Sequence, residues 1–268
     1  MKSLIIFISA LLSTVCGVYI HTAKFKSIIG GTPAEQGKFP YLADIGIIEN
    51  GVTTWCGGGV LASVQWVLTS SSCLSQIWVG DKKVVIFLGS TNRASNEFGT
   101  LRFEISPNST NIIFNTGSAD ANDELVLIQL PNRINWTKYI QPVSLPGTRD
   151  CYGLLFKEKA LAIGWSNDTS SVLNYLELTT MKSTKCVEEY DPERRDIIAP
   201  KNICAKLEMK SDQTCFAGVG APLVTQEYKV LMGLTSTLSL NNCEKPGTPV
   251  IFLRITEYLD WIKTIADV

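Results

Sequence analysis

The stretch GVLASVQWVLT, residues 59–69, is rich in β-branched and apolar residues and is followed by a run of serines. This composition is typical of a β-strand. Similar short runs recur along the chain, at residues 41–48, 84–89, 101–105, 125–130, 159–163, 173–181, 221–224 and 229–235. Turn-forming Gly, Asn, Asp, Ser and Pro separate these runs, so the pattern predicts an all-β protein of the sandwich or barrel kind.

Helix is predicted mainly at the end of the chain. From Ile255 onward, Leu259, Ile262 and Ile265 follow at steps of three and four residues. This spacing gives a one-sided apolar stripe, which suits a C-terminal helix docked on a finished β-structure. The stretch near residues 141–157 carries several Pro and Gly residues, and we expect it to connect two halves of the protein.

The N-terminus has the features of a secretory signal peptide. Lys2 precedes an apolar run from Leu4 to Val15, and small residues surround Cys16. About 12 apolar residues fall short of the roughly 20 that a membrane-spanning helix needs. We therefore expect residues 1–17 to be removed and residues 18–27 to form a short propeptide-like segment. The protein is then secreted into the extracellular space, without a membrane anchor.

Composition narrows the classes of partner. The 268 residues include 24 Lys and Arg against 25 Asp and Glu. This balance argues against a polybasic protein that binds nucleic acid or an anionic membrane. The patterns beginning at Asn108, Asn135 and Asn167 match the acceptor sequence for N-glycosylation, and we expect one or more of them to carry a glycan on an exposed loop.

Seven cysteines remain if the signal peptide is removed after Gly17. Export favours disulfides over reduced thiols. The chain has no C-x-x-C pair and only one histidine, His21, so we expect no zinc site, and no metal or cofactor is implied. Three disulfides and one unpaired thiol are the simplest account of the odd number.

A series of ordered motifs resembles the chymotrypsin-like (trypsin-fold) serine proteases. The motifs are Ile28-Ile29-Gly30-Gly31, Gly37-Lys38-Phe39-Pro40-Tyr41, Trp55-Cys56-Gly57-Gly58, Trp66-Val67-Leu68-Thr69, Asn122-Asp123, Gly164-Trp165, Ala221-Pro222-Leu223 and Tyr258-Leu259-Asp260-Trp261-Ile262. The resemblance implies two six-stranded antiparallel β-barrels with a C-terminal helix, in one domain over residues 28–268. Residues 247–254 resemble a pattern common in arthropod members.

The resemblance also implies how the cysteines pair. Cys56 would bridge to Cys73, and the remaining disulfides would join Cys186 to Cys204 and Cys215 to Cys243. Cys151 is left without a partner. Such a cysteine in an exported protein is either a buried thiol or the site of an intermolecular disulfide that links a dimer.

The proton-transfer residue of the family is missing. Where the family has the general-base histidine, this chain reads Ser70-Ser71-Ser72-Cys73, with Ser72 at the histidine position. A hydroxyl cannot accept a proton near neutral pH and later return it. His21 precedes the barrels and cannot substitute. Asp123 is the one triad residue retained, and we expect it only to accept hydrogen bonds.

The nucleophile motif is altered independently. Val219 stands at the position of the family's serine, and a hydrocarbon side chain can form no acyl-enzyme. Gly218 replaces the aspartate that pairs with the new amino terminus after activation. Ala217 replaces a glycine of the oxyanion hole, and its Cβ restricts the backbone there.

The specificity pocket also departs from the family. Gln213 falls at the pocket base, where a neutral amide offers no strong selection for Lys or Arg. Ser236, Thr237 and Leu238 correspond to the pocket wall, and the leucine would narrow the entrance.

These substitutions predict a secreted, catalytically inactive serine protease homologue, a pseudoprotease that acts on an unidentified protein partner as cofactor, decoy or regulatory ligand. One alternative is a hydrolase with relocated chemistry, in which Ser70, Ser71 or Ser72 works with a lysine base. Another is a structural or interaction component of a secretion, linked through Cys151.

Overall fold

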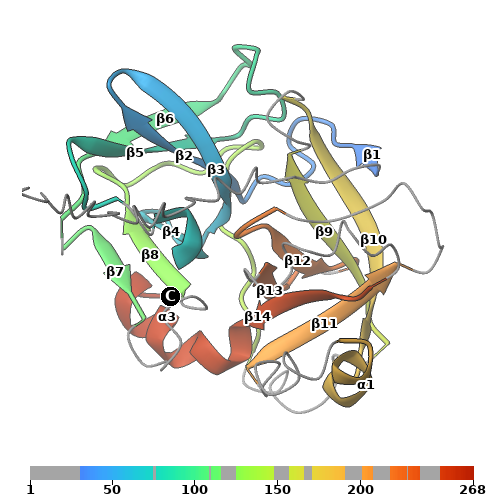
Figure 1. Ribbon diagram of the computed structural model, residues 1–268. Helices are drawn as coiled ribbons and strands as arrows, with labels where there is room; N and C mark the ends of the chain where they lie inside the picture. The colour runs from blue at the N-terminus through green and yellow to red at the C-terminus, as the bar shows by residue number, and fades with distance from the viewer. Residues whose placement is uncertain are drawn as a thin grey trace, which may run out of the picture.

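The computed structural model describes residues 31–74, 77–108, 110–115, 125–147, 157–165, 171–190, 201–207, 218–227, 229–235 and 248–268. Within them the chain forms two antiparallel β-sheets that lie side by side, with a C-terminal helix beneath the first sheet (Figure 1). None of the helices in these residues has the length and apolar character needed to cross a bilayer.

The first sheet has seven strands in the order β6-β5-β2-β3-β4-β8-β7. The strands are Leu42–Glu49 (β2), Val52–Leu61 (β3), Trp66–Ser70 (β4), Lys82–Leu88 (β5), Leu101–Ile105 (β6), Ile112–Phe114 (β7) and Leu125–Gln129 (β8). The resemblance implied a closed six-stranded barrel. Instead, among the described residues β6 pairs with β5 and β7 pairs with β8, and β6 and β7 stand at opposite edges of an open sheet.

The second sheet closes on itself. Its order is β1-β10-β11-β14-β13-β12-β9, and an additional pairing of β10 with β9 makes a ring of six strands, as expected. The strands are Thr32–Pro33 (β1), Lys159–Trp165 (β9), Leu173–Met181 (β10), Asn202–Leu207 (β11), Pro222–Thr225 (β12), Leu231–Thr235 (β13) and Val250–Arg254 (β14). The predicted trypsin-like fold is therefore confirmed, with an open first sheet and a closed second one.

The stretch at residues 59–69 is not one strand, as predicted, but parts of two. β3 ends at Leu61 and β4 begins at Trp66. Between them the amide of Ala62 donates to the carbonyl of Trp66 at 2.7 Å, which closes a tight turn. Both arms have strand composition, so composition alone did not reveal the reversal. Sequence analysis also missed β1, β7, β11, β14 and the short helix Ser183–Glu188 (α1).

The β2–β3 hairpin has a clear local cause. Asn50 and Gly51 form its two-residue loop, with φ of 52° and 79°, and Glu49 pairs with Val52. An Asn-Gly pair is the preferred sequence for a type I′ turn, which needs positive φ at both positions. The hairpin projects from the first sheet, at the upper left of the molecule (Figure 1).

The C-terminal helix confirms the predicted stripe. A 3₁₀ turn at Ile255–Tyr258 (η5) leads into Leu259–Ala266 (α3), so the helix begins more tightly wound than predicted. Leu259, Ile262 and Ala266 are buried. Ile262 belongs to the same apolar cluster as Leu127 of the first sheet and Leu253 of the second. The helix therefore packs into the core that joins the two sheets.

Two disulfides are present among the described residues, Cys56–Cys73 and Cys186–Cys204, with the pairing that the resemblance implies. Cys151, Cys215 and Cys243 lie outside the described residues, as do residues 1–27. The first sheet ends at Gln129 and β9 begins at Lys159, while β1 pairs with β10 of the second sheet. Residues 130–147 therefore belong to neither sheet, and residues 148–156 lie outside the described part.

Candidate active site

The serine turn, residues 70–73, follows β4 and opens the 3₁₀ helix Ser71–Leu74 (η1). The Oγ atoms of Ser70 and Ser72 lie 2.9 Å apart and share a hydrogen bond. Ser70 is 0% exposed and Ser71 is 4% exposed, so neither hydroxyl can meet a substrate. Cys73 anchors the turn to β3 through its disulfide with Cys56. Ser72 is the one serine of the turn that is partly exposed.

The valine turn, residues 218–221, precedes β12. Its Val219 side chain is 1% exposed and belongs to the apolar cluster that also contains Cys73 and Leu74. The Val219 carbonyl accepts a 2.8 Å hydrogen bond from the amide of Gly58. The structure therefore brings the valine turn and the serine turn to the same apolar cluster.

The Val219 side chain thus fills space inside the protein instead of facing a substrate. A nucleophile must be reachable and must be paired with a base within hydrogen-bond distance. Val219, which the resemblance assigns to the nucleophile position, is buried hydrocarbon, and Ser72, which it assigns to the base position, has a hydroxyl that shares a hydrogen bond with Ser70. The described residues of the two turns therefore present a packed apolar cluster and one partly exposed hydroxyl, that of Ser72.

Several predicted site residues lie outside the described residues, so the structure does not test the predictions made for them. They are Asp123, Gln213, Ala217, Ser236, Thr237, Leu238 and Asn167. In the described ranges, no three His, Cys, Asp or Glu side chains gather in a way that could hold a metal ion.

The predicted glycosylation acceptors Asn108 and Asn135 are both exposed. The Oδ1 atom of Asn108 accepts hydrogen bonds from the amide and the hydroxyl of Thr110 at 2.9 and 2.6 Å. The side-chain nitrogen of Asn108 (Nδ2), the atom that would carry a glycan, takes no part in these two hydrogen bonds. Attachment of a glycan at either residue remains a prediction.

Sequence analysis missed a buried ion pair that lies where the two sheets meet. Asp44 of β2 is 0% exposed, and both of its oxygens accept hydrogen bonds from the guanidinium of Arg93. The guanidinium carbon lies 4.9 Å from the ring centroid of Trp55 and 5.2 Å from that of Trp165. Trp55 belongs to the first sheet and Trp165 to the second, so Arg93 bridges the two.

The one sequence signal for this pair was a charged residue within the apolar stretch at residues 41–48. Buried charges in proteins are paired. That rule predicts a cationic partner for Asp44, but it could not have selected Arg93, which lies 49 residues away.

The pair should give the stability of the protein a pH dependence. Burial raises the pKa of Asp44 from 3.8 to about 6, although the hydrogen bonds and charge of Arg93 oppose the increase. The folded protein therefore binds a proton more tightly than the unfolded chain does. The stability from this group is complete below about pH 4 and is lost as the pH rises through about 6.

Urea unfolding of wild type and Asp44→Asn between pH 4 and 8 tests this expectation. The difference in unfolding free energy between the two proteins should fall by roughly 2–4 kcal/mol from pH 4 to 6 and then level off. A difference that stays constant with pH would mean that Asp44 does not titrate in this range.

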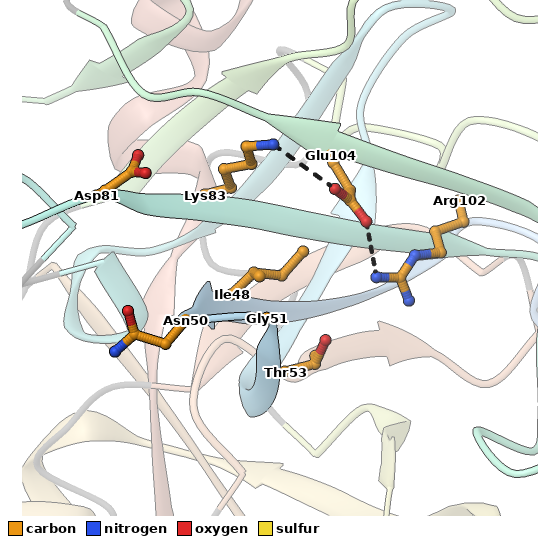
Figure 2. Close-up of a pocket in the computed structure, with 8 residues that line it drawn as sticks. All are labelled: Ile48, Asn50, Gly51, Thr53, Asp81, Lys83, Arg102 and Glu104. Carbon is orange, nitrogen blue, oxygen red and sulfur yellow. Dashed lines mark hydrogen bonds and ion pairs between the residues drawn. The ribbon is translucent and has the colours of Figure 1, made fainter.

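A shallow pocket of about 340 Å³ lies away from both turns (Figure 2). It is formed by the tip of the β2–β3 hairpin and by β5 and β6. At its centre Glu104 lies 4.0 Å from the ammonium of Lys83 and 3.0 Å from the guanidinium of Arg102. These side chains are about half exposed, so the ion pairs are weak and easily screened. The pocket contains no residue of the serine or valine turn.

Comparison with known sequences places the whole β-structure in one family. The family described as Trypsin matches residues 28–262. A relative named Collagenase, from Hypoderma lineatum, is 31% identical over 271 residues, which cover 98% of this chain and 97% of the relative. Serine protease 1 of Drosophila melanogaster is 30% identical over 240 residues, covering 88% of this chain and 84% of the relative.

Solved structures give the same result. The structure described as HL collagenase has a TM-score of 0.72 and 30% identity, with 90% of this chain and 99% of that chain covered. Human heparin binding protein has a TM-score of 0.68 at 24% identity, with 90% of this chain and 97% of that chain covered. The second likeness concerns the fold alone.

Proposed function

This chain belongs to the trypsin family of serine proteases, and from that premise we propose that it is a secreted, catalytically inactive member that acts by binding another protein. The observation that carries the proposal is the buried Val219 side chain, in the turn where the family has its nucleophile. Loss of either the serine or the histidine of the triad in subtilisin costs about a millionfold in kcat. Here the residues at two triad positions are chemically unsuitable.

The relatives indicate which activity would have been lost. Those named Collagenase and Serine protease 1 carry the names of proteases. This chain has the trypsin-like fold and a Cys56–Cys73 disulfide that holds the serine turn, as the resemblance implies, while Ser72 and Val219 depart from the family's pattern. Retention of the scaffold without the reacting groups supports a role in recognition.

The alternative of relocated Ser–Lys chemistry has little support from the geometry. Ser70 and Ser71 are buried, and the Ser70 hydroxyl shares its hydrogen bond with Ser72. A general base must lie within hydrogen-bond reach of the nucleophile. Ser72 is then the serine on which this alternative depends, and Ser72→Ala is the variant that tests it.

We expect the purified mature protein to show no labelling by a fluorophosphonate probe and no cleavage of casein. The reason is that no imidazole is present beyond His21 to activate a hydroxyl. Val219→Ser should remain unlabelled, because the new hydroxyl would be buried and would have no base. Trypsin serves as the positive control for casein cleavage and for probe labelling. Probe labelling of wild type that disappears in Ser72→Ala would contradict the proposal and favour relocated chemistry.

A further inference from the structure

The most exposed large apolar side chain among the described residues is Phe98, at 83%. It lies in the loop between β5 and β6, residues 89–100. Single exposed apolar residues are common on protein surfaces and need no explanation by themselves. Phe98 differs because its loop is held rigidly and because its neighbours are aromatic and cationic.

An acidic side chain organises the loop from within. The Glu97 carboxylate accepts hydrogen bonds from the hydroxyl of Ser90 at 2.8 Å, from the amide and hydroxyl of Thr91, each at 2.6 Å, and from the amide of Asn92 at 2.9 Å. Burial acts to raise the pKa of Glu97, but these hydrogen bonds outweigh it and hold the pKa below its usual value. Glu97 is thus fully engaged inside the loop.

The loop is also fastened to the rest of the protein. The Phe98 carbonyl accepts a 2.9 Å hydrogen bond from the side chain of Gln36. The amide of Leu173 donates to the Thr91 carbonyl at 2.7 Å, and Arg93 pairs with buried Asp44. A side chain presented by such a loop loses little conformational freedom when a partner binds, so less of the binding energy is spent on ordering.

Phe98 meets a second aromatic ring at the surface. Its ring centroid lies 6.4 Å from that of Tyr139, in an edge-to-face arrangement. Gly99 makes this approach feasible, because a Cβ there would lie 2.6 Å from the Tyr139 ring. The two rings form an apolar patch, and aromatic residues of this kind are enriched in the centres of protein interfaces.

One lysine, Lys138, borders these rings, and a second, Lys38, lies on the neighbouring segment with its ammonium on Tyr175. The Lys138 ammonium lies 4.6 Å from the Tyr139 ring centroid. The Lys38 ammonium donates to the Tyr175 hydroxyl at 2.7 Å and lies 4.0 Å from that ring. Gly37, next to Lys38, packs its backbone against the Lys138 carbonyl and the Tyr139 ring, so the segments that carry the two lysines lie side by side.

Both lysines are exposed, and neither forms an ion pair with a carboxylate of the described residues. Glu97, the acidic residue beside Phe98, has its carboxylate occupied by its own loop. Positive charge next to exposed aromatic rings therefore has its complement in negative charge on another molecule.

We propose that Lys38, Phe98, Lys138 and Tyr139 form a docking surface for an acidic protein segment that carries an aromatic side chain. The aromatic side chain packs on the Phe98 and Tyr139 rings, and flanking carboxylates pair with the two ammonium groups. The inference deepens the proposed binding function and rests on it for its biological role, since the surface would be the place where the partner is held.

The probe is a fluorescein-labelled peptide, Gly-Ser-Glu-Asp-Phe-Glu-Asp-Ser-Gly, and binding is measured by fluorescence anisotropy. We expect Phe98→Ala to weaken binding about tenfold, and the double variant Lys38→Glu/Lys138→Glu to weaken it by about tenfold or more. Binding should also weaken with added salt, because exposed charges are screened. Replacing the Phe of the peptide by Ala should reproduce the effect of Phe98→Ala.

Val79→Ala and Lys201→Glu are the matched controls, since each alters an exposed side chain outside the docking surface, and they should leave the affinity unchanged. Absence of peptide binding to wild type overturns the inference. Peptide binding that is insensitive to Phe98→Ala overturns it too. If dextran sulfate then displaces the peptide, and the lysine double variant abolishes that displacement, the surface binds sulfated polymers instead.

Fluorophosphonate labelling of the same preparations separates the two proposals. An unlabelled protein that fails to bind the peptide contradicts the docking surface alone. A labelled protein that binds the peptide through Phe98 contradicts catalytic inactivity and leaves the surface standing.

Discussion

Arg93→Ala should destabilise the folded protein by about 3 to 5 kcal/mol at pH 7, because it leaves the Asp44 carboxylate buried without a partner. Asp44 is 0% exposed and the Arg93 side chain 13%, so water cannot replace the lost interactions. The substitution also removes the cation between the Trp55 and Trp165 rings. Urea unfolding followed by tryptophan fluorescence would measure the effect.

The Lys83–Glu104 pair provides the matched control, since both side chains are nearly half exposed. Lys83→Ala should cost less than about 1 kcal/mol. The double variant Asp44→Asn/Arg93→Ala should be more stable than Arg93→Ala, because no charge then remains buried. If Arg93→Ala lowers the unfolding free energy no more than Lys83→Ala does, the Asp44–Arg93 pair does not stabilise the contact between the two sheets.

Gly220→Ala should destabilise the protein by about 3 kcal/mol or more, through two separate effects. The residue has φ of +65°, a left-handed conformation that costs an L-residue about 1–2 kcal/mol. A Cβ there would also lie 2.3 Å from the Gly58 carbonyl oxygen, so one backbone segment must move. That movement would disturb the hydrogen bond from the Gly58 amide to the Val219 carbonyl, which joins β3 to the valine turn.

Gly51→Ala separates the two effects. Gly51 has φ of +79°, and a Cβ there would meet no atom within 4 Å. The variant should therefore show the conformational cost alone, about 1–2 kcal/mol. If Gly51→Ala and Gly220→Ala lower the unfolding free energy equally in chemical unfolding, the contact between a Cβ at residue 220 and Gly58 adds no destabilisation.

Secondary structure was predictable where local pattern decides it. Leu101–Ile105 and Leu173–Met181 were predicted with the bounds that they have in the structure, and the apolar stripe from Ile255 identified the C-terminal helix. The turn between β3 and β4 was missed, because strand-forming residues continue on both sides of it. The Asn50-Gly51 pair is the local sequence signal for the β2–β3 hairpin, since it favours a type I′ turn.

The strand pairing at the edges of the first sheet could not be predicted from the sequence either. The expected six-stranded barrel is an open seven-stranded sheet in the described residues, since β7 pairs with β8 while β6 pairs with β5. Strand pairing joins segments that lie far apart in the sequence, and the composition of each strand does not say which neighbour it pairs with.

The sequence by itself determined which reactive groups the chain contains, because folding cannot supply a second imidazole beside His21 or convert the Val219 hydrocarbon into a nucleophile. Only the tertiary structure decided that Val219 is buried, that Arg93 meets Asp44 across 49 residues, and that Phe98 lies beside Tyr139. Those contacts arise when two sheets pack together, and packing depends on the shape of the whole chain, which no local pattern records.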